Sequence, residues 1–76
     1  MNGIILHVSS DLGAFMMSLI PEDTIDTIKQ TVEWAQEIPP EYQVLYHHGK
    51  LLIPFNYNYS NFKNEDSVKV VDIRDL

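Results

Sequence analysis

Three histidines are the residues of this 76-residue chain with the most suggestive chemistry, and two of them are adjacent. Imidazole nitrogens are common zinc ligands, so His47 and His48, with His7 as a third candidate, could indicate a metal site. Adjacent residues of a strand point to opposite faces, and the residues flanking the pair supply neither a cysteine nor an ordered acidic ligand. We therefore expect no metal ligands here. Solvation in a turn is the simplest interpretation, and a pH-sensitive contact is the alternative, because histidine titrates near neutral pH.

Serine side chains could act as nucleophiles, but the residues that accompany them argue against catalysis. No serine is accompanied by a recognisable base and orienting acid, and the chain has no glycine-rich phosphate loop. A chain of this size would also have difficulty in surrounding a substrate. We expect no catalytic residue, no cofactor and no enzyme activity.

The charge of the chain is strongly acidic and unevenly distributed. The net charge is −6, from 11 acidic and 5 basic side chains, which argues against nonspecific binding to nucleic acid. Acidic residues dominate the range 22–41, whereas four of the bases follow it: Lys50, Lys63, Lys69 and Arg74. This distribution predicts an acidic helix, with a solvated face as the simplest interpretation, and a sheet that is nearly neutral to basic.

The location of the protein is constrained by two further features of the sequence. The chain contains no cysteine, which fits a reducing compartment. No apolar run approaches the roughly 20 residues that span a bilayer, and no basic segment precedes an apolar stretch at the N-terminus. We expect a cytoplasmic or nuclear protein without a membrane partner.

The first elements that would position these side chains are a hairpin and a helix. Apolar residues alternate from residue 4 to 9 and again from 15 to 20, around a polar turn that ends at Gly13, and this predicts a β-hairpin. Helical spacing follows in an apolar stripe made of Ile25, Ile28, Val32 and Ala35. Thr24 is a suitable N-cap and Pro39-Pro40 cannot continue a helix, so the helix should run from about Thr24 to Gln36.

The second half of the chain predicts more strands. Residues 42–46 read as a third strand, 47–50 as a turn and 51–53 as a short fourth strand. The range 54–62, rich in asparagine and tyrosine, is expected to be a loop that can include one helical turn, and 68–73 is expected to form the last strand.

Four short motifs in this order resemble ubiquitin and the ubiquitin-like domains. Asp23-Thr24-Ile25 opens the helix, Ile38-Pro39-Pro40 closes it, and Gln43-x-Leu45 and Gly49-Lys50-x-Leu52 follow at corresponding spacing. The resemblance extends more weakly over nearly the whole length. It implies an α+β ubiquitin-like β-grasp, in which a mixed sheet holds one helix (about 24–36), and a single ubiquitin-like domain over residues 1–76.

The resemblance also implies a protein-binding patch on the sheet face away from the helix. Its central aliphatic position falls on Tyr46 and its C-terminal valine on Val71, and its loop leucine falls within Ser9–Leu12, where the lengths differ. Val44 and Ile73 replace basic residues that the family usually carries, so partners with more apolar contacts should suit this surface better. The predicted protein-binding residues are Tyr46, Gly49, Lys50, Val71, Val44, His48 and Lys69, together with Trp34.

Trp34 falls roughly opposite the centre of the apolar stripe of the helix. It could fold down against neighbouring loops or the stems of the acidic side chains, or it could anchor a second partner surface, since an exposed tryptophan is often an anchor.

The chain ends Ile73-Arg74-Asp75-Leu76, without the glycine pair that conjugation requires. We therefore expect a non-conjugated domain, and its start at Met1 resembles the N-terminal domains of proteasome-shuttle proteins. The expected partners are a proteasomal ubiquitin receptor, a ubiquitin-interacting helix or ubiquitin itself, bound by a monomer. The alternative is a structural or regulatory β-grasp domain that packs against its own parent protein or another partner.

Overall fold

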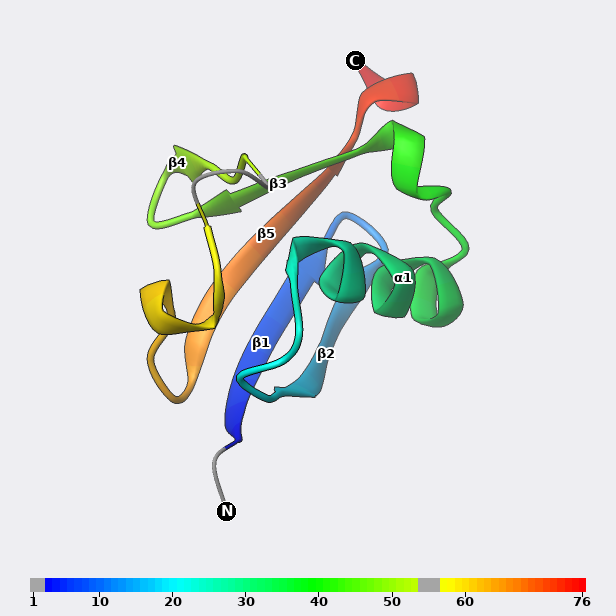
Figure 1. Cartoon of the computed structure of the whole chain (residues 1–76). Helices are drawn as coiled ribbons and strands as arrows, with labels where there is room; N and C mark the ends of the chain where they lie inside the picture. Colours follow the sequence, from blue (N-terminus) through cyan, green and yellow to red (C-terminus); the bar gives the residue numbers. More distant parts are fainter. Residues whose placement is uncertain (1–2, 54–56) are drawn as a thin grey trace.

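A mixed five-stranded sheet with one helix across one of its faces forms the structure (Figure 1). The computed structural model describes residues 3–53 and 57–76. The main elements are β1 (Ile4–Ser10), β2 (Gly13–Leu19), α1 (Ile25–Gln36), β3 (Gln43–His47), β4 (Lys50–Leu51) and β5 (Asp66–Asp72). Short 3-10 turns occur at Pro40–Tyr42, Tyr59–Asn61 and Ile73–Asp75. The strand order is β2-β1-β5-β3-β4, with β1 and β5 parallel and the other pairs antiparallel, which confirms the predicted α+β β-grasp fold.

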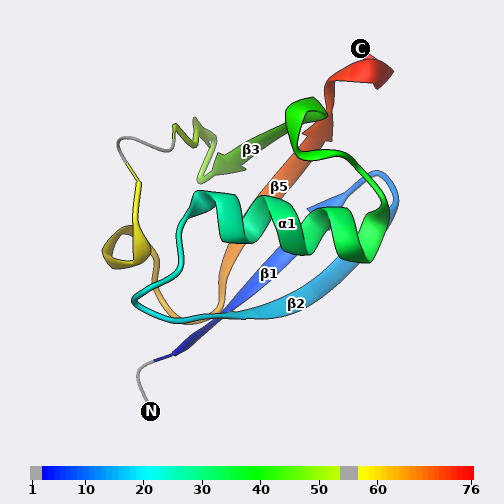
Figure 2. The same ribbon diagram turned by 45° about the vertical axis from the view of Figure 1, so that its right-hand side comes forward.

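The helix lies across the sheet, as Figure 2 shows, and begins and ends close to the predicted residues. At its start the Thr24 N–H donates to Thr27 Oγ1 at 3.1 Å. At its end Glu37 takes the left-handed conformation, with φ of 59°, and its N–H donates to the Glu33 carbonyl oxygen at 2.8 Å. This left-handed residue ends the helix before the prolines are reached.

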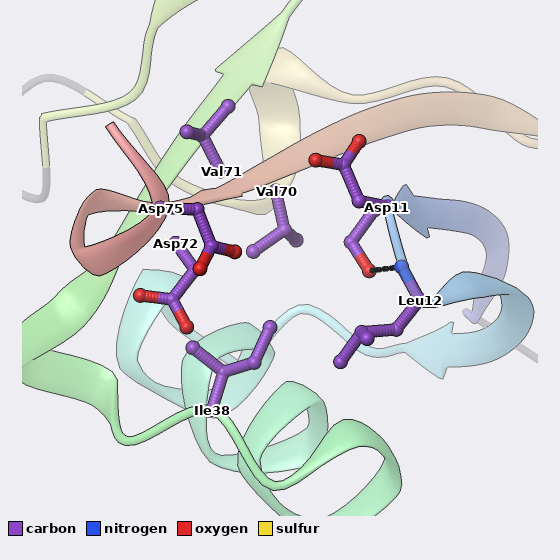
Figure 3. A pocket seen from close by; sticks show the side chains of 8 residues that line it. Asp11, Leu12, Ile38, Val70, Val71, Asp72 and Asp75 are labelled. Atoms are coloured by element: carbon purple, nitrogen blue, oxygen red, sulfur yellow. Dashed lines mark hydrogen bonds between the residues drawn. The ribbon is translucent and has the colours of Figure 1, made fainter.

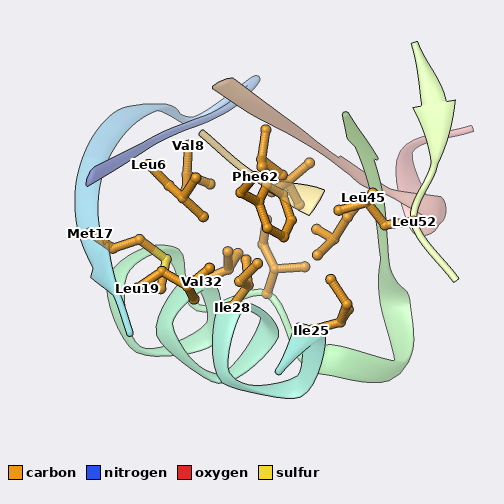
Figure 4. Packing of buried hydrophobic residues seen from close by; sticks show 13 residues of the cluster. Leu6, Val8, Met17, Leu19, Ile25, Ile28, Val32, Leu45, Leu52 and Phe62 are labelled. Carbon is orange, nitrogen blue, oxygen red and sulfur yellow. The ribbon is translucent and has the colours of Figure 1, made fainter. Parts of the chain in front are cut away.

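The core lies between the helix and the sheet, and Figure 4 shows the side chains that fill it. Ile25, Ile28 and Val32 are buried as the stripe predicted, but Ala35 is exposed, so its assignment to the core was wrong. Ala35 lines an open groove between the end of the helix and the start of β2, which its short side chain does not fill. Ile38, just beyond the helix, is buried instead.

Two glutamines connect the ends of the helix region to the sheet. Gln43 is buried, and its Nε2 donates to the carbonyl oxygens of Lys29 and Ile38, at 2.8 Å each. Gln36 Nε2 donates to the Gly13 carbonyl oxygen at 3.2 Å, and its Oε1 accepts from Ser10 Oγ at 2.7 Å. These bonds hold the hairpin tip and the first residue of β3 against the helix.

Strand boundaries after the helix differ from the predicted ones by one or two residues. Tyr42 belongs to a 3-10 turn, in which its N–H donates to the Pro39 carbonyl oxygen at 2.9 Å, so β3 starts at Gln43 and includes His47. The fourth strand is Lys50–Leu51 rather than 51–53, and the last strand starts at Asp66 and ends before Ile73. The predicted helical turn in the loop is Tyr59–Asn61, and residues 54–56 of that loop lie outside the described residues.

Candidate protein-binding surface

The sheet face turned away from the helix brings together four of the predicted binding residues. In the antiparallel pairing of β3 and β5, Val44 lies opposite Val71 and Tyr46 lies opposite Lys69. Side chains alternate between faces along a strand, so the buried Leu45 and Val70 point to the helix and these four point away from it. Val44, Tyr46 and Val71 are half-buried and Lys69 is exposed. We call these four residues the outer patch.

The strand register extends this surface to residues that were not predicted. Tyr46 lies opposite Leu51 of β4, and Lys69 lies beside Ser9 of β1. Leu51 is 50% exposed, whereas the next residue, Leu52, is buried. The alternation of these two leucines was the signal in the sequence that Leu51 belongs to the outer face. Leu51 therefore adds an apolar neighbour to Tyr46.

Gly49 and Lys50 border the outer patch through the tight turn between β3 and β4. His47 pairs with Lys50, which leaves His48 and Gly49 as the two turn residues, with φ of 52° and 77°. Two successive positive φ angles are typical of the two-residue hairpin turns that match the twist of a sheet. The predicted glycine and lysine thus lie next to Tyr46 and Leu51, with Lys50 exposed.

His48 does not follow the alternation expected of adjacent strand residues. Its imidazole ring lies 4.1 Å from that of His47, centroid to centroid, so the expectation that the two side chains diverge was wrong. The physical reason is that β3 ends at His47 and His48 takes a left-handed conformation, which redirects its side chain. Both histidines face Asp66, the first residue of β5, which gives them the acidic neighbour that the flanking sequence lacks.

At the other end of the outer patch a shallow cavity of about 40 Å³ adjoins Val71 (Figure 3). Its other lining residues include Asp11, Leu12 and Asp75. Leu12 is largely exposed, and it is the leucine of the hairpin turn that the sequence left unassigned to the patch. A hollow of this size does not hold a substrate, because ligand sites measure about 300–1,000 Å³.

Asp72, the last residue of β5, forms an ion pair with Arg74 in the turn that follows. Asp72 Oδ1 accepts from the backbone N–H and from Nε of Arg74, at 2.9 and 3.0 Å, and Oδ2 accepts from Nη2 at 2.8 Å. The side-chain bonds, followed by the backbone bond, lower the pKa of the Asp72 carboxyl, and the same ion pair raises the pKa of Arg74. The guanidinium carbon also lies 4.5 Å above the centroid of the Tyr42 ring. Residues 73–75 are therefore folded into a turn.

The family model described as the Ubiquitin family matches residues 6–71, from β1 to the last residue of the outer patch. The chain belongs to the ubiquitin family. A comparison with curated proteins gave no match. Membership indicates a protein-interaction role for this ubiquitin-like domain, and domains of this family are generally not enzymes. Among residues 3–53 and 57–76, no helix is long and apolar enough to cross a membrane.

Trp34 forms a separate surface of the ubiquitin-like domain, on the side of α1 that faces away from the sheet. Its side chain is 88% exposed, so the expectation that it folds down onto neighbouring groups was wrong. Glu33 and Glu37 on the same helix are exposed as well. An exposed indole among carboxylates differs in character from the outer patch, where the exposed charges nearest to Tyr46 are lysines.

Proposed function

We propose that this ubiquitin-like domain is a non-conjugated recognition module of a ubiquitin–proteasome pathway protein, which binds its partners through the outer patch. The observation that carries the proposal is the cross-strand arrangement of Val44, Tyr46 and Val71, three half-buried apolar residues on the uncovered face of the sheet. Tyrosine presents a large, rigid contact surface and is enriched among binding hot spots. Leu51, which lies opposite Tyr46, extends the apolar area at one end of the patch.

The chemistry of the patch favours an amphipathic helix that carries carboxylates. The exposed ammonium groups of Lys50 and Lys69 border the apolar centre, although the whole chain has a net charge of −6. An apolar helix face can lie on the valines and Tyr46, while acidic side chains at its edges pair with the two lysines. Ubiquitin-interacting helices, proteasomal ubiquitin receptors and ubiquitin itself are the partners we propose on this basis.

An NMR titration with a ubiquitin-interacting helix, and separately with ubiquitin, tests the proposal. Amide shifts should centre on Tyr46, Gly49 and Val71, and Tyr46→Ala should weaken binding by about 10-fold or more, as expected for an interfacial hot spot. Trp34→Ala is the matched control, because it also removes an aromatic side chain, but from the opposite side of the molecule. Equal affinities of the wild type and Tyr46→Ala for both ligands would contradict the proposal.

The non-conjugated state is part of the proposal, and the local structure of residues 73–75 supports it. Conjugation requires a flexible tail that enters the narrow cleft of an activating enzyme, whereas Arg74 is bound to Asp72 and lies over Tyr42. Incubation with activating enzyme and ATP should yield no thioester, and a thioester would refute this part of the proposal.

We further place the domain, as one unit over residues 1–76, in a proteasome-shuttle protein of the cytoplasm or nucleus, where it acts as a monomer. Purified proteasomes should retain the chain and should retain the Tyr46→Ala variant less well. Equal retention of both forms, or of neither, would argue against this placement. Gel filtration or light scattering of the free chain checks the monomeric state.

A second candidate function is supported by the exposure of Trp34. In this alternative the domain packs through its acidic helix surface against its parent protein or another partner, with the indole as the anchor. Trp34→Ala should then abolish that association while Tyr46→Ala leaves it intact. Unchanged association of the Trp34→Ala variant would exclude this alternative.

A further inference from the structure

Three side chains that the proposed recognition function does not use converge below the turn between β3 and β4. His47 Nε2 lies 2.8 Å from Asp66 Oδ2, and His48 Nε2 lies 3.5 Å from Asp66 Oδ1. One potential ligand atom from each residue lies within 4.8 Å of the other two. Lys63, next to the start of β5, donates its backbone N–H to Asp66 Oδ2 at 2.8 Å, which helps to fix the carboxylate.

The kind of these atoms matches the requirements of a transition-metal ion. Two imidazole nitrogens and one carboxylate oxygen form a donor set that suits Zn²⁺ and its first-row neighbours. Bonds of about 2.0–2.2 Å in a tetrahedron place ligand atoms about 3.3 Å apart. The observed separations of 2.8 and 3.5 Å run to Oδ2 and Oδ1 of Asp66, and one ligand atom from each residue lies within 4.8 Å of the others, so the side chains would have to move together by up to about 1.5 Å to bind one ion.

The surroundings of the three residues differ from those of an accidental surface cluster. The side chains of His47 and Asp66 are only 5% and 14% exposed, whereas that of His48 is 67% exposed. Two ligands are therefore held by the fold, and the third lies on the solvent side, where an ion can enter and water can complete its coordination. His47 Nδ1 lies 3.0 Å from the Tyr57 hydroxyl, an outer-shell partner that can accept the Nδ1 proton in a hydrogen bond once Nε2, which now donates to Asp66, binds a metal instead.

The backbone conformation of His48 explains how its ring reaches the cluster. Its φ of 52° lies in the left-handed region, which costs free energy for a residue with a Cβ atom. Gly49, the other turn residue, has φ of 77° without that cost. Histidine is one of the residues other than glycine that are enriched in this region, and here the conformation directs its ring to His47 and Asp66.

We propose that His47, His48 and Asp66 form a binding site for a divalent transition-metal ion such as Zn²⁺, with water in the remaining coordination position. His47 would bind through Nε2 while Nδ1 carries its proton toward Tyr57, and the metal would replace the hydrogen bond that now joins His47 to Asp66. The site lies directly beside Gly49 and Lys50, so the ion would stiffen the turn that borders the outer patch. This inference is independent of the identity of the protein partner.

Titration of the 76-residue chain with ZnCl₂, followed by calorimetry and by NMR, tests the proposal. One ion should bind per chain, the amides around His47, His48 and Asp66 should shift, and the melting temperature should rise with zinc concentration, because an ion that binds only the folded state stabilises it. Absence of heat and of amide shifts with zinc in excess would overturn the proposal.

Two variants separate a specific site from general attraction of zinc to an acidic protein. His48→Gly removes a ligand and suits the left-handed turn, so the chain should stay folded. Its zinc affinity should fall by more than about 10-fold, because the loss of an outer-shell partner alone already lowers metal affinity by about 10-fold or more. His7→Gln is the matched control, since His7 lies 3.6 Å from Glu65, outside the cluster, and its loss should leave affinity unchanged. Unchanged zinc affinity of His48→Gly, or a loss on His7→Gln, would refute the assignment.

Discussion

The two faces of the sheet can be compared at neighbouring residues of one strand. Leu45 points to the helix and is 1% exposed, whereas Tyr46 points away from it and is half-buried on the uncovered face. Across the sheet, Leu45 pairs with Val70, which is also buried, and Tyr46 pairs with the exposed Lys69. The covered face therefore contributes mainly to folding, and the uncovered face keeps large apolar side chains whose burial can still stabilise a complex.

Because side chains alternate between the two faces of a strand, one set of residues in this small domain stabilises the fold and the neighbouring set remains available for binding. Short chains bury a modest part of their surface, so few core side chains can be lost without unfolding. Residues one position apart can nevertheless change independently, because they contact different surroundings. The substitutions below test this separation through their effects on the free energy of unfolding.

Leu45→Ala should have the largest effect. Removing the buried leucine side chain leaves a cavity next to Val70 and the helix, and such substitutions lower the free energy of unfolding by about 2–5 kcal/mol. The neighbouring Tyr46→Ala should lower it by less than about 1 kcal/mol, because the tyrosine is only half-buried. Urea denaturation measures both, and equal losses would contradict the separation of the two faces.

Gln43→Leu should have the next largest effect. The substitution conserves approximate size but removes Nε2, which donates to the carbonyl oxygens of Lys29 and Ile38. The Lys29 carbonyl oxygen keeps its helical partner, so the Ile38 carbonyl oxygen is the acceptor at risk. Leaving a buried acceptor unpaired costs about 1–3 kcal/mol, and the free energy of unfolding should fall toward the lower end of that range, because the substitution also removes Gln43 Oε1, which has no partner among the described residues. Hydrogen exchange should also be faster at the end of the helix, and a variant as stable as the wild type would show that these bonds contribute little.

Asp72→Asn should have a smaller, pH-dependent effect at the C-terminal end of β5. The hydrogen bonds from Arg74 lower the pKa of the Asp72 carboxyl in the folded state. The carboxylate therefore stabilises the fold above the unfolded pKa of about 3.9, and this stabilisation is lost as the pH falls through the lower folded pKa. Denaturation at pH 7 should find the variant less stable, and the difference should close below about pH 4. A constant difference across this range would exclude the ion pair as its cause.

Trp34→Ala should have the smallest effect on stability, within about 0.5 kcal/mol, because the indole makes little contact with the fold. Thermal and urea denaturation should give curves that nearly overlay those of the wild type. A substantial loss would mean that the tryptophan packs on the domain in solution, which would remove the reason to regard it as a second partner surface.

Local patterns in the sequence predicted the fold and most of the outer patch. Ile25, Ile28 and Val32 have helical spacing, and their burial follows from that period. The family resemblance assigned Tyr46 and Val71 to the sheet face away from the helix, and the alternation along β3 and β5 places both side chains there. Leu51 was missed, although its alternation with Leu52 contained the same information.

The errors occur where backbone conformation or distant neighbours decide the outcome. Ala35 has the right spacing for the core, but the sheet does not reach it at the end of the helix. One of the two alternatives for Trp34 was that it packs against neighbouring loops or acidic side chains, yet it remains exposed on the outer side of the helix. Neither outcome follows from periodicity, because periodicity gives the direction of a side chain and not what lies in that direction.

Local patterns in the sequence are sufficient to predict the order of the elements, the approximate limits of the helix and the face of the sheet that most side chains occupy. These depend on local spacing and on turn residues such as Gly13 and Gly49, although the left-handed Glu37 ends the helix before Pro39-Pro40 is reached. The contact of His47 and His48 with Asp66, in contrast, follows from the three-dimensional arrangement of the strands. The reason is physical: the left-handed backbone of His48 breaks the alternation, and the antiparallel pairing of β3 and β5 brings the carboxylate from 19 residues away.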